Sequence, residues 1–413
     1  MRTHPFSLEL SNKAALLDNF FFTHSHASHH HFSVFSLRQY LFSLIDPYGL
    51  TRTLREVSLC RDESGRAIYS AGNSAVVFRI RHADGEGALR CYLRPNPRLK
   101  ALYGEQVLEQ ELFIYETSTT GRWVDVVLSE WREGITLQTA IEEAARAHDA
   151  VQLGRLAKAF DQLACQLVAD DWAHGDLKPD NLILDPAGQL HLIDFDACYL
   201  PSMQGLRAIE LGTRAFQHPK RTAQDFNERL DDFPATLITI ALHALAMDPT
   251  LYDRYGARDG LLLDPHRLEG DPAYEELLSL FECAGNARLY RMACALRHPL
   301  ADNPALVGLF QEPEPYNDPT GASLELFAEW GLWGFRCKER VVIPPRYDNG
   351  FDFSEGVAAV QVGRRWHFID PSGRVVLHVP PCEAVKPFRN GRATFLHRGT
   401  RQAIDITGRI FDI

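Results

Sequence analysis

The sequence predicts an α+β protein with a strand-rich N-terminal part, a helical middle and a C-terminal β-hairpin repeat. Three observations support this prediction. Strand and turn residues alternate between about residues 50 and 133, apolar residues recur with helical spacing after Gly134, and similar segments repeat at an offset of 35 residues near the C-terminus. A chain of 413 residues is long enough for two or three domains.

The composition excludes several classes of protein. Hydrophobic residues make up 45% of the chain and charged residues 23%, as in soluble globular proteins. The formal net charge of −11 offers no basic field for nucleic acid. No stretch approaches the ~20 apolar residues that span a bilayer. The eight cysteines are dispersed, which suits free thiols better than a disulfide framework or a structural zinc site. We therefore expect a cytoplasmic protein that binds neither nucleic acid nor a membrane.

The strand-rich part begins after a histidine-rich lead-in. Residues 1–32 carry a tract of five histidines, which we interpret as a solvated segment rather than a metal site because no fixed scaffold surrounds it. Residues 75–80 and 88–93 flank the turn residues 83–87 and predict a hairpin. Residues 98–108 follow two prolines and predict a short helix, and residues 124–129 predict a buried strand.

The middle of the chain is predicted to be helical. Between residues 151 and 168 the apolar positions fall on one helical face, and residues 233–247 predict a buried helix. Residues 311–320 contain three prolines and resemble a linker. The predicted domains are therefore a lead-in (1–32), an α+β domain (33–311, divided near 133 and 134), a linker (312–320) and a repeat domain (321–413).

The repeat domain is recognised by matching segments. Phe353-Ser-Glu-Gly356 recurs as Phe388-Arg-Asn-Gly391, and the Ile369-Asp-Pro-Ser-Gly373 turn recurs around Gly408. Because each copy consists of two short β-runs around glycine turns, we expect β-hairpins packed side by side.

The strongest chemical signal lies between His174 and Asp194. A hairpin here is expected to bring Asp176, Asn181 and Asp194 close to the cation of Lys178. Phosphoryl transfer needs such a set, namely a carboxylate to orient the attacking hydroxyl, oxygen ligands for Mg²⁺ and a cation near the phosphate.

These residues resemble the catalytic and magnesium-binding loops of protein kinases, which read H-R-D-L-K-x-x-N and D-F-G. The resemblance implies a bilobal protein-kinase-like fold that uses ATP and Mg²⁺. It makes Asp176 the catalytic carboxylate, Lys178 the partner of the γ-phosphate, and Asn181 and Asp194 the metal ligands. Two residues depart from the pattern, because Gly175 stands where most kinases have Arg and Asp196 stands where the motif has Gly.

Further nucleotide contacts are implied upstream. Residues 70–77 align with the kinase glycine-rich loop but keep only its middle glycine, Gly72, and Arg90 stands where the phosphate-pairing lysine is expected. Its implied carboxylate partner is Glu105, which we favour over Glu109. Taken on its own, Arg90 would be interpreted as a solvated strand residue, but its place in the pattern favours the phosphate role.

The adenine site and the C-terminal part of the domain are also implied by the resemblance. Glu130 and Trp131 stand at the position of the kinase hinge. Four apolar residues would enclose adenine or simply belong to the core: Val77, Ala88, Ile183 and Ile193. Residues 211–221 resemble the end of an activation segment, and Asp231 resembles the structural aspartate that anchors the catalytic loop.

The C-terminal segments resemble WG repeats, known from bacterial proteins, through Trp333-Gly334 and the Pro344 to Asp348 segment. No catalytic role attaches to these repeats, which suggests a module that recruits a protein partner or substrate. The leading functional hypothesis is an ATP- and Mg²⁺-dependent Ser/Thr-type protein kinase. The alternatives are a pseudokinase scaffold with weak or no catalysis, and a small-molecule phosphotransferase of the aminoglycoside or choline kinase type.

Overall fold

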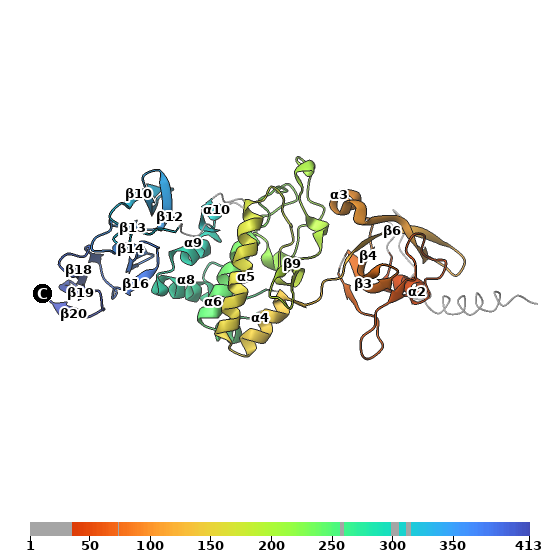
Figure 1. Cartoon of the computed structure of the whole chain (residues 1–413), viewed down its shortest axis with the longest axis horizontal. Coiled ribbons are helices and arrows are strands. Elements are labelled where there is room, and N and C mark those ends of the chain that lie inside the picture. The colour runs from red at the N-terminus through yellow and green to blue at the C-terminus, as the bar shows by residue number, and fades with distance from the viewer. Residues whose placement is uncertain (1–34, 73, 257–259, 299–304, 311–314) are drawn as a thin grey trace, which may run out of the picture. The chain divides into compact units, whose positions relative to one another are not determined.

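The computed structural model describes residues 35–72, 74–256, 260–298, 305–310 and 315–413. The chain forms two compact units, residues 1–133 and 134–413 (Figure 1). The division coincides with the boundary predicted between residues 133 and 134. The helical region after residue 134 and the C-terminal repeats belong to the same unit. The predicted histidine-rich lead-in lies outside the described residues.

The first unit is built on an antiparallel sheet. Its strands are β1 (Ser58–Leu59), β2 (Tyr69–Ala71), β3 (Ala75–His82), β4 (Gly85–Tyr92), β5 (Val107–Tyr115) and β6 (Gly121–Glu130). They lie in the order β1-β3-β4-β6-β5, and β2 also pairs with β3. β3 and β4 form the predicted hairpin, and β6 contains the predicted buried strand. Alternate residues of β3, namely Val76, Phe78 and Ile80, are buried against α2 (Leu37–Ile45) and neighbouring strands.

The predicted helix over residues 98–108 is wrong at its C-terminal end. The structure has a short helix α3 (Leu99–Tyr103) and a 3₁₀ turn η1 (Gly104–Gln106), and β5 begins at Val107. Gly104 ends the helix with a left-handed φ of 52°, which glycine adopts at little cost. Val107 and Leu108 then pair with β6, so strand pairing prevails over the helix-forming composition of the segment.

The second unit begins with a helical region. Its helices are α4 (Leu137–Arg146), α5 (Ala150–Ala169), α6 (Asp232–Met247), α7 (Leu251–Tyr255), α8 (Pro272–Ala284), α9 (Ala287–Ala295) and α10 (Ala305–Phe310). α5 and α6 confirm the two helices predicted from periodicity and from apolar content, and they share one large core. A small sheet of β7 (Ile135–Thr136), β8 (Leu182–Leu184) and β9 (Leu190–Leu192) carries the segments predicted to hold the site.

The C-terminal repeats form three antiparallel meanders (Figure 1). The first contains β10 (Glu325–Glu329), β11 (Leu332–Cys337) and β12 (Arg340–Tyr347). The second contains β13 (Asn349–Gly350), β14 (Ala358–Val362), β15 (Arg365–Ile369) and β16 (Val375–His378). The last contains β17 (Ala384–Val385), β18 (Arg392–His397), β19 (Thr400–Asp405) and β20 (Ile410–Asp412). The repeated glycines Gly356 and Gly391 both have positive φ, which explains why the repeat preserves them.

The repeats pack against the end of the helical region. Ala287 of α9 is buried with Phe335 and Ile343 of the first meander. The Nε of Arg291 donates to the backbone oxygen of Arg346 (3.2 Å), and the Arg291 guanidinium pairs with Asp348. The first two meanders are therefore fixed to the helices by buried apolar and polar contacts. Residues 311–314 of the predicted linker lie outside the described residues.

Within the described ranges, no helix combines the length and the apolar character needed to cross a membrane.

Candidate functional site

The loop from His174 to Asn181 begins from a strand-like segment that follows α5. Ala173 exchanges backbone hydrogen bonds with Tyr199, at 3.1 and 2.9 Å. The ring of His174 is fully buried, and its Nε2 lies 2.9 Å from the backbone oxygen of Ile193. The start of the loop is therefore tied to the segment that follows β9.

Gly175 is required by the backbone of this loop. Its φ is +77°, and a Cβ at this position would lie 2.2 Å from the backbone oxygen of Ala197. A larger residue would need both a left-handed backbone and a shift of that carbonyl. The departure from the kinase pattern at this position therefore has a steric cause, since an arginine cannot be accommodated in this geometry.

Asp231, at the start of α6, anchors the same loop. Its carboxylate accepts hydrogen bonds from the backbone N–H of His174 and of Gly175, the latter at 3.0 Å. The side chain is almost completely buried, and burial raises the pKa of Asp231 while the charge of His174 and the two N–H donors lower it. This arrangement matches the structural role that the sequence implies for Asp231.

Asp176, Lys178 and Asn181 meet at the end of the loop. The Nδ2 of Asn181 donates to the backbone oxygen of Asp176 (2.8 Å) and to its Oδ2 (3.2 Å). The Nζ of Lys178 lies 3.2 Å from the same Oδ2. The structure thus brings together the three loop residues predicted from the sequence. The Asp176 side chain remains 16% exposed, so a substrate atom could reach it.

A segment far along the chain completes the surroundings of Asp176. The backbone N–H of Thr213 donates to Asp176 Oδ1, and Lys178 Nζ donates to the Thr213 hydroxyl at 2.8 Å. Gly212 has a φ of +74°, and a Cβ there would lie 2.9 Å from Asp176 Oδ1. The sequence placed Gly212 and Thr213 in an activation-like segment but gave Thr213 no role. The sequence signal that could have identified this role is the Gly212-Thr213 pair, which precedes His218-Pro219.

Arg221 is a second residue that sequence reasoning missed. Its Nη1 donates to the backbone oxygen of Gly175 at 2.9 Å and also to the Gln217 side chain. Its Nε and Nη2 are buried without a hydrogen-bond partner among the described residues. Burial lowers the pKa of Arg221, and the charges of Asp231 and Asp176 oppose that effect. The guanidinium of Arg221, from the activation-like segment, therefore lies beside Gly175, the position at which the kinase pattern has an arginine.

Asp194 follows β9 in a left-handed conformation, with φ 69° and ψ 64°. A non-glycine residue rarely adopts this conformation, and such residues concentrate at functional sites. The backbone N–H of Ile193 donates to the backbone oxygen of Asn181 at 3.0 Å, which places the two predicted metal-binding segments side by side. By contrast, Asp196 lies in the 3₁₀ turn η3 (Phe195–Ala197) and has a negative φ, so it does not need the glycine of the kinase motif.

Asn181 and Asp194 have the chemistry of a magnesium site, because amide and carboxylate oxygens are hard ligands that Mg²⁺ prefers. Among the described residues, no three His, Cys, Asp or Glu side chains are grouped so that they could hold a metal ion. A Mg²⁺ ion bound by Asn181 and Asp194 would therefore take its other ligands from phosphate oxygens and water, as Mg²⁺ commonly does.

In the first unit, Arg90 is buried within the sheet. It lies on β4 opposite Val77 of β3, it is 8% exposed, and its guanidinium carbon is 6.0 Å from the ring centres of both Tyr92 and Tyr103. The predicted partner Glu105 lies in η1 and is exposed. The alternative, Glu109, pairs with Lys100 at 3.2 Å.

The other predicted nucleotide contacts occupy ordinary sheet and turn positions. Gly72 follows β2, its φ lies outside the left-handed region, and a Cβ there would make a normal 3.6 Å contact with Ala75. Val77 is half-buried and Ala88 buried in the first unit, and Ile183 and Ile193 are half-buried in the second. Glu130 is exposed and pairs with Arg132 at 2.9 Å. The ring centre of Trp131 lies 5.3 Å from the guanidinium carbon of Arg79.

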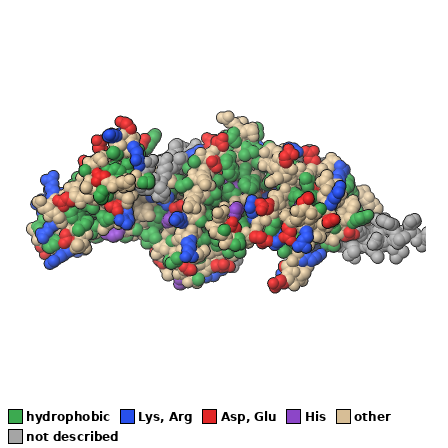
Figure 2. All heavy atoms as spheres, viewed as in Figure 1, with side chains coloured by type: hydrophobic (Ala, Val, Ile, Leu, Met, Phe, Trp, Pro, Cys, Tyr) green, Lys and Arg blue, Asp and Glu red, His purple; other side chains and the backbone are tan. Residues whose placement is uncertain are grey.

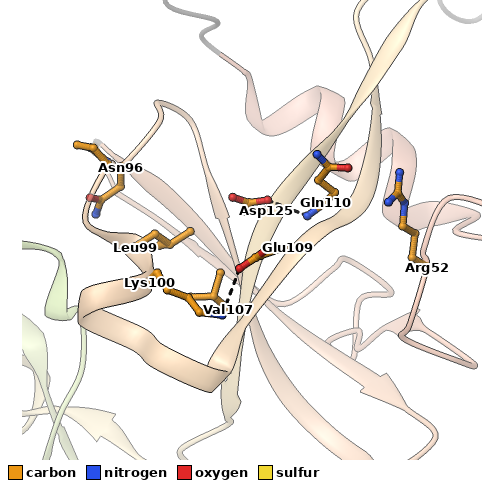
Figure 3. Close-up of a pocket in the computed structure, with 9 residues that line it drawn as sticks. Arg52, Asn96, Leu99, Lys100, Val107, Glu109, Gln110 and Asp125 are labelled. Carbon is orange, nitrogen blue, oxygen red and sulfur yellow. Dashed lines mark hydrogen bonds and ion pairs between the residues drawn. The ribbon is translucent and has the colours of Figure 1, made fainter.

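A cavity of about 580 Å³ in the first unit contains none of these predicted residues (Figure 3). It lies beside α3 and a bulge of β5, where Gln110 has a positive φ and donates its backbone N–H to Asp125 at 2.7 Å. Its lining mixes cations and carboxylates, and two of these, Lys100 and Glu109, already pair with each other. The cavity therefore favours no single ligand charge.

Comparison with protein families identifies the C-terminal part. The family model of the WG containing repeat matches residues 338–366, which span β12, β13 and β14 and end in β15. This part of the chain is therefore similar to a WG containing repeat, as the sequence motifs predict. The match does not reach the loop at residues 174–181, so the resemblance of that loop to protein kinases rests on its own residues and geometry.

Proposed function

We propose that this protein is an ATP- and Mg²⁺-dependent protein kinase with a bilobal kinase-like fold, which transfers the γ-phosphate to a protein hydroxyl. The observation that carries the proposal is the constellation of Asp176, Lys178 and Asn181 on one loop. The left-handed Asp194 supports it, because the segment containing this residue is hydrogen-bonded to Asn181.

Each residue has a role that follows from its chemistry. Asp176 orients the substrate hydroxyl and accepts its hydrogen bond, and Lys178 supplies positive charge where the transferred phosphate gains negative charge. Asn181 and Asp194 would hold the metal ion. The bound ion would neutralise charge on the phosphates. The hydrogen bond from the Thr213 N–H leaves Asp176 little freedom to rotate, which favours one orientation of the carboxylate.

A protein substrate is favoured over a small molecule. The activation-like segment reaches Asp176 through Thr213 and the loop backbone through Arg221, so a folded surface adjoins the catalytic carboxylate. The repeats would then recruit the substrate or a partner, as their lack of catalytic residues suggests. A small-molecule phosphotransferase of the aminoglycoside or choline kinase type would instead accept a free hydroxyl compound and ignore added protein.

A non-catalytic pseudokinase scaffold is favoured by a different observation. Arg90 stands at the position of the phosphate-pairing lysine, its guanidinium carbon lies 6.0 Å from the ring centres of two tyrosines, and α3 is only five residues long. Arginine and lysine present different geometry to a phosphate, so substitution at this position can weaken nucleotide positioning.

A transfer assay tests the proposal. Purified full-length protein is incubated with γ-labelled ATP, Mg²⁺ and a mixture of generic protein substrates. The wild type should label protein, and Asp176→Asn should lower the rate at least 100-fold because the hydroxyl is no longer oriented by a carboxylate. Asp180→Asn is the matched control, since this exposed carboxylate on the same loop forms no part of the constellation.

The outcomes separate the three functions. Labelling that survives Asp176→Asn contradicts the assigned role of Asp176. Absence of transfer together with retained ATP binding supports the scaffold. Transfer to aminoglycosides or choline but not to proteins supports the small-molecule phosphotransferase.

A further inference from the structure

The last meander has one buried face and one exposed face. Ala393, Phe395 and Ile404 point into the core shared with the second meander. Because side chains alternate along a strand, the residues between them point outward. The register confirms this, since Leu396 on β18 lies opposite Arg401 on β19, and Ala403 lies opposite Phe411 on β20. We name this outer face by its six residues: Lys386, Arg392, Leu396, Arg401, Arg409 and Phe411.

The outer face contains an aromatic ring, that of Phe411, with two guanidinium groups close to it. The guanidinium carbon of Arg392 lies 3.9 Å from the ring centre of Phe411, and that of Arg409 lies 5.2 Å from the same centre. Stacking on the ring holds the two cations in place without neutralising them, because the ring has no net charge. The four cations of the outer face are exposed, as is Leu396.

The carboxylates of this region accept hydrogen bonds within the meander, and Asp405 also lies opposite Arg392 in the strand register. Between residues 383 and 413 there are six Lys and Arg against three Asp and Glu. Glu383 accepts the backbone N–H of Arg398, Asp405 accepts those of Thr407 and Arg409, and Asp412 accepts the Gln402 side chain. By comparison, residues 321–350 of the first meander carry four cations and four carboxylates. The excess of cations is therefore a property of the last meander and not of the first. Figure 2 shows blue Lys and Arg side chains beside red Asp and Glu side chains on the C-terminal part of the chain.

We propose that the outer face of the last meander binds an extended acidic peptide segment of a partner protein. Arg392, Arg401, Arg409 and Lys386 pair with carboxylates of the peptide, and Leu396 and Phe411 contact its apolar side chains. In the described chain β20 pairs with β19 alone, so its outer edge can also hydrogen-bond to a peptide backbone. The inference deepens the proposal that the repeats recruit a partner and is independent of phosphoryl transfer.

Charge argues for a peptide over other occupants. The net charge of the chain is −11, so a long polyanion such as nucleic acid would be repelled by the rest of the molecule. A short peptide with a few carboxylates can lie within about 8 Å of the cations, which is the distance over which physiological salt screens charge.

Binding is measured by fluorescence polarisation with full-length protein, no nucleotide and a labelled deca-glutamate peptide, with deca-glutamine as the neutral probe. Deca-glutamate should bind and deca-glutamine should not. Raising the salt concentration from about 50 to 300 mM should weaken binding, since the contact is electrostatic. The double variant Arg392→Ala/Arg409→Ala should bind deca-glutamate on the order of tenfold more weakly. Arg401→Ala, which leaves the stacked pair intact, should weaken it about threefold.

The matched control is Arg336→Ala on the first meander. This exposed arginine also lies over a phenylalanine, with its guanidinium carbon 5.5 Å from the ring centre of Phe327, but in a meander with balanced charge. It should bind deca-glutamate within about twofold of the wild type.

Several results would overturn the proposal. The proposal fails if deca-glutamate does not bind, or if the double variant binds it as tightly as the wild type does. It also fails if Arg336→Ala loses as much affinity for deca-glutamate as the double variant loses. A single-stranded oligonucleotide of equal charge that binds more tightly than the peptide would assign the face to nucleic acid. Sedimentation that shows self-association abolished by the double variant would assign it to a second copy of the chain. Because the assay contains no ATP, its failure is distinct from a failure of the transfer assay.

Discussion

The loop around Asp176 and the nucleotide-phosphate residues expected in the first unit differ in how tightly their surroundings specify them. Asp231 and Arg221 hold the loop through hydrogen bonds to its backbone. The backbone N–H of Thr213 holds it through a hydrogen bond to the carboxylate of Asp176. At Gly72, by contrast, neither the backbone conformation nor the available space demands a glycine. Several hydrogen bonds therefore specify the loop around Asp176, whereas nothing in the backbone specifies a glycine at position 72.

The largest expected effect of this difference is at Gly175. Gly175→Ala should lower the free energy of unfolding by about 3 kcal/mol or more, because the new Cβ meets a backbone oxygen at 2.2 Å and φ is left-handed. Gly188→Ala is the control, since φ there is also positive, at +83°, but nothing lies within 4 Å of the Cβ. It should cost about 1 kcal/mol. Urea denaturation measures both, and equal losses would show that backbone conformation alone makes Gly175 necessary.

The second unit also depends on buried polar contacts at its helix–repeat junction. His367 of β15 is buried. Its Nε2 lies 3.0 Å from the backbone oxygen of Glu282, and its Nδ1 lies 3.0 Å from the ring Nδ1 of His378. Burial, and then the nearby His378, lower the pKa of His367 to about 4. The folded protein therefore resists protonation of this ring, whereas the unfolded chain accepts a proton near pH 6.5.

Stability should consequently fall as the pH drops from about 6.5 to 4, and His367 should account for about 2 to 3 kcal/mol of the loss. Other groups titrate in the same range, so the measurement is the difference between the wild type and His367→Phe in urea denaturation at several pH values. If the two pH profiles ran parallel, the histidine would have no part in the acid sensitivity.

Arg221 should affect catalysis more than stability. We expect Arg221→Gln to reduce kcat for phosphoryl transfer about tenfold, because the loop carbonyl of Gly175 loses its cationic donor. Arg221→Lys should restore part of that loss by keeping the charge. Initial-rate kinetics with Arg214→Gln as the control, an exposed arginine of the same segment, measures the effect. A change in KM for ATP without a change in kcat would contradict the positioning role.

The smallest expected effect on stability is at Gly72. Gly72→Ala should change the free energy of unfolding by less than about 0.5 kcal/mol, because its φ is unexceptional and the nearest atom to a Cβ lies at 3.6 Å. It should also leave the affinity for ATP within about twofold. A large loss of affinity would show that ATP requires a bare backbone at this turn, and the kinase-like glycine would then be functional.

The sequence predicts those features that depend on local pattern. The β3–β4 hairpin, α5, α6, the repeats and the gathering of Asp176, Lys178 and Asn181 all arise within short segments. The early end of α3 was not foreseen, because the pairing of Val107 with β6 depends on a distant strand. Thr213 and Arg221 reach the loop only when the chain folds back over it, so no local pattern reveals their contacts. The steric need for Gly175 likewise depends on Ala197, in a different segment.

The proposed kinase function depends most directly on a magnesium-dependent nucleotide site at Asn181 and Asp194. Isothermal titration of full-length protein with ATP, with and without Mg²⁺, tests it in the wild type, Asp194→Asn and Asp176→Asn. We predict that removing Mg²⁺ or introducing Asp194→Asn weakens ATP binding at least tenfold, whereas Asp176→Asn stays within about twofold of the wild type. Absence of ATP binding, or binding that ignores both Mg²⁺ and Asp194→Asn, would contradict the proposed site.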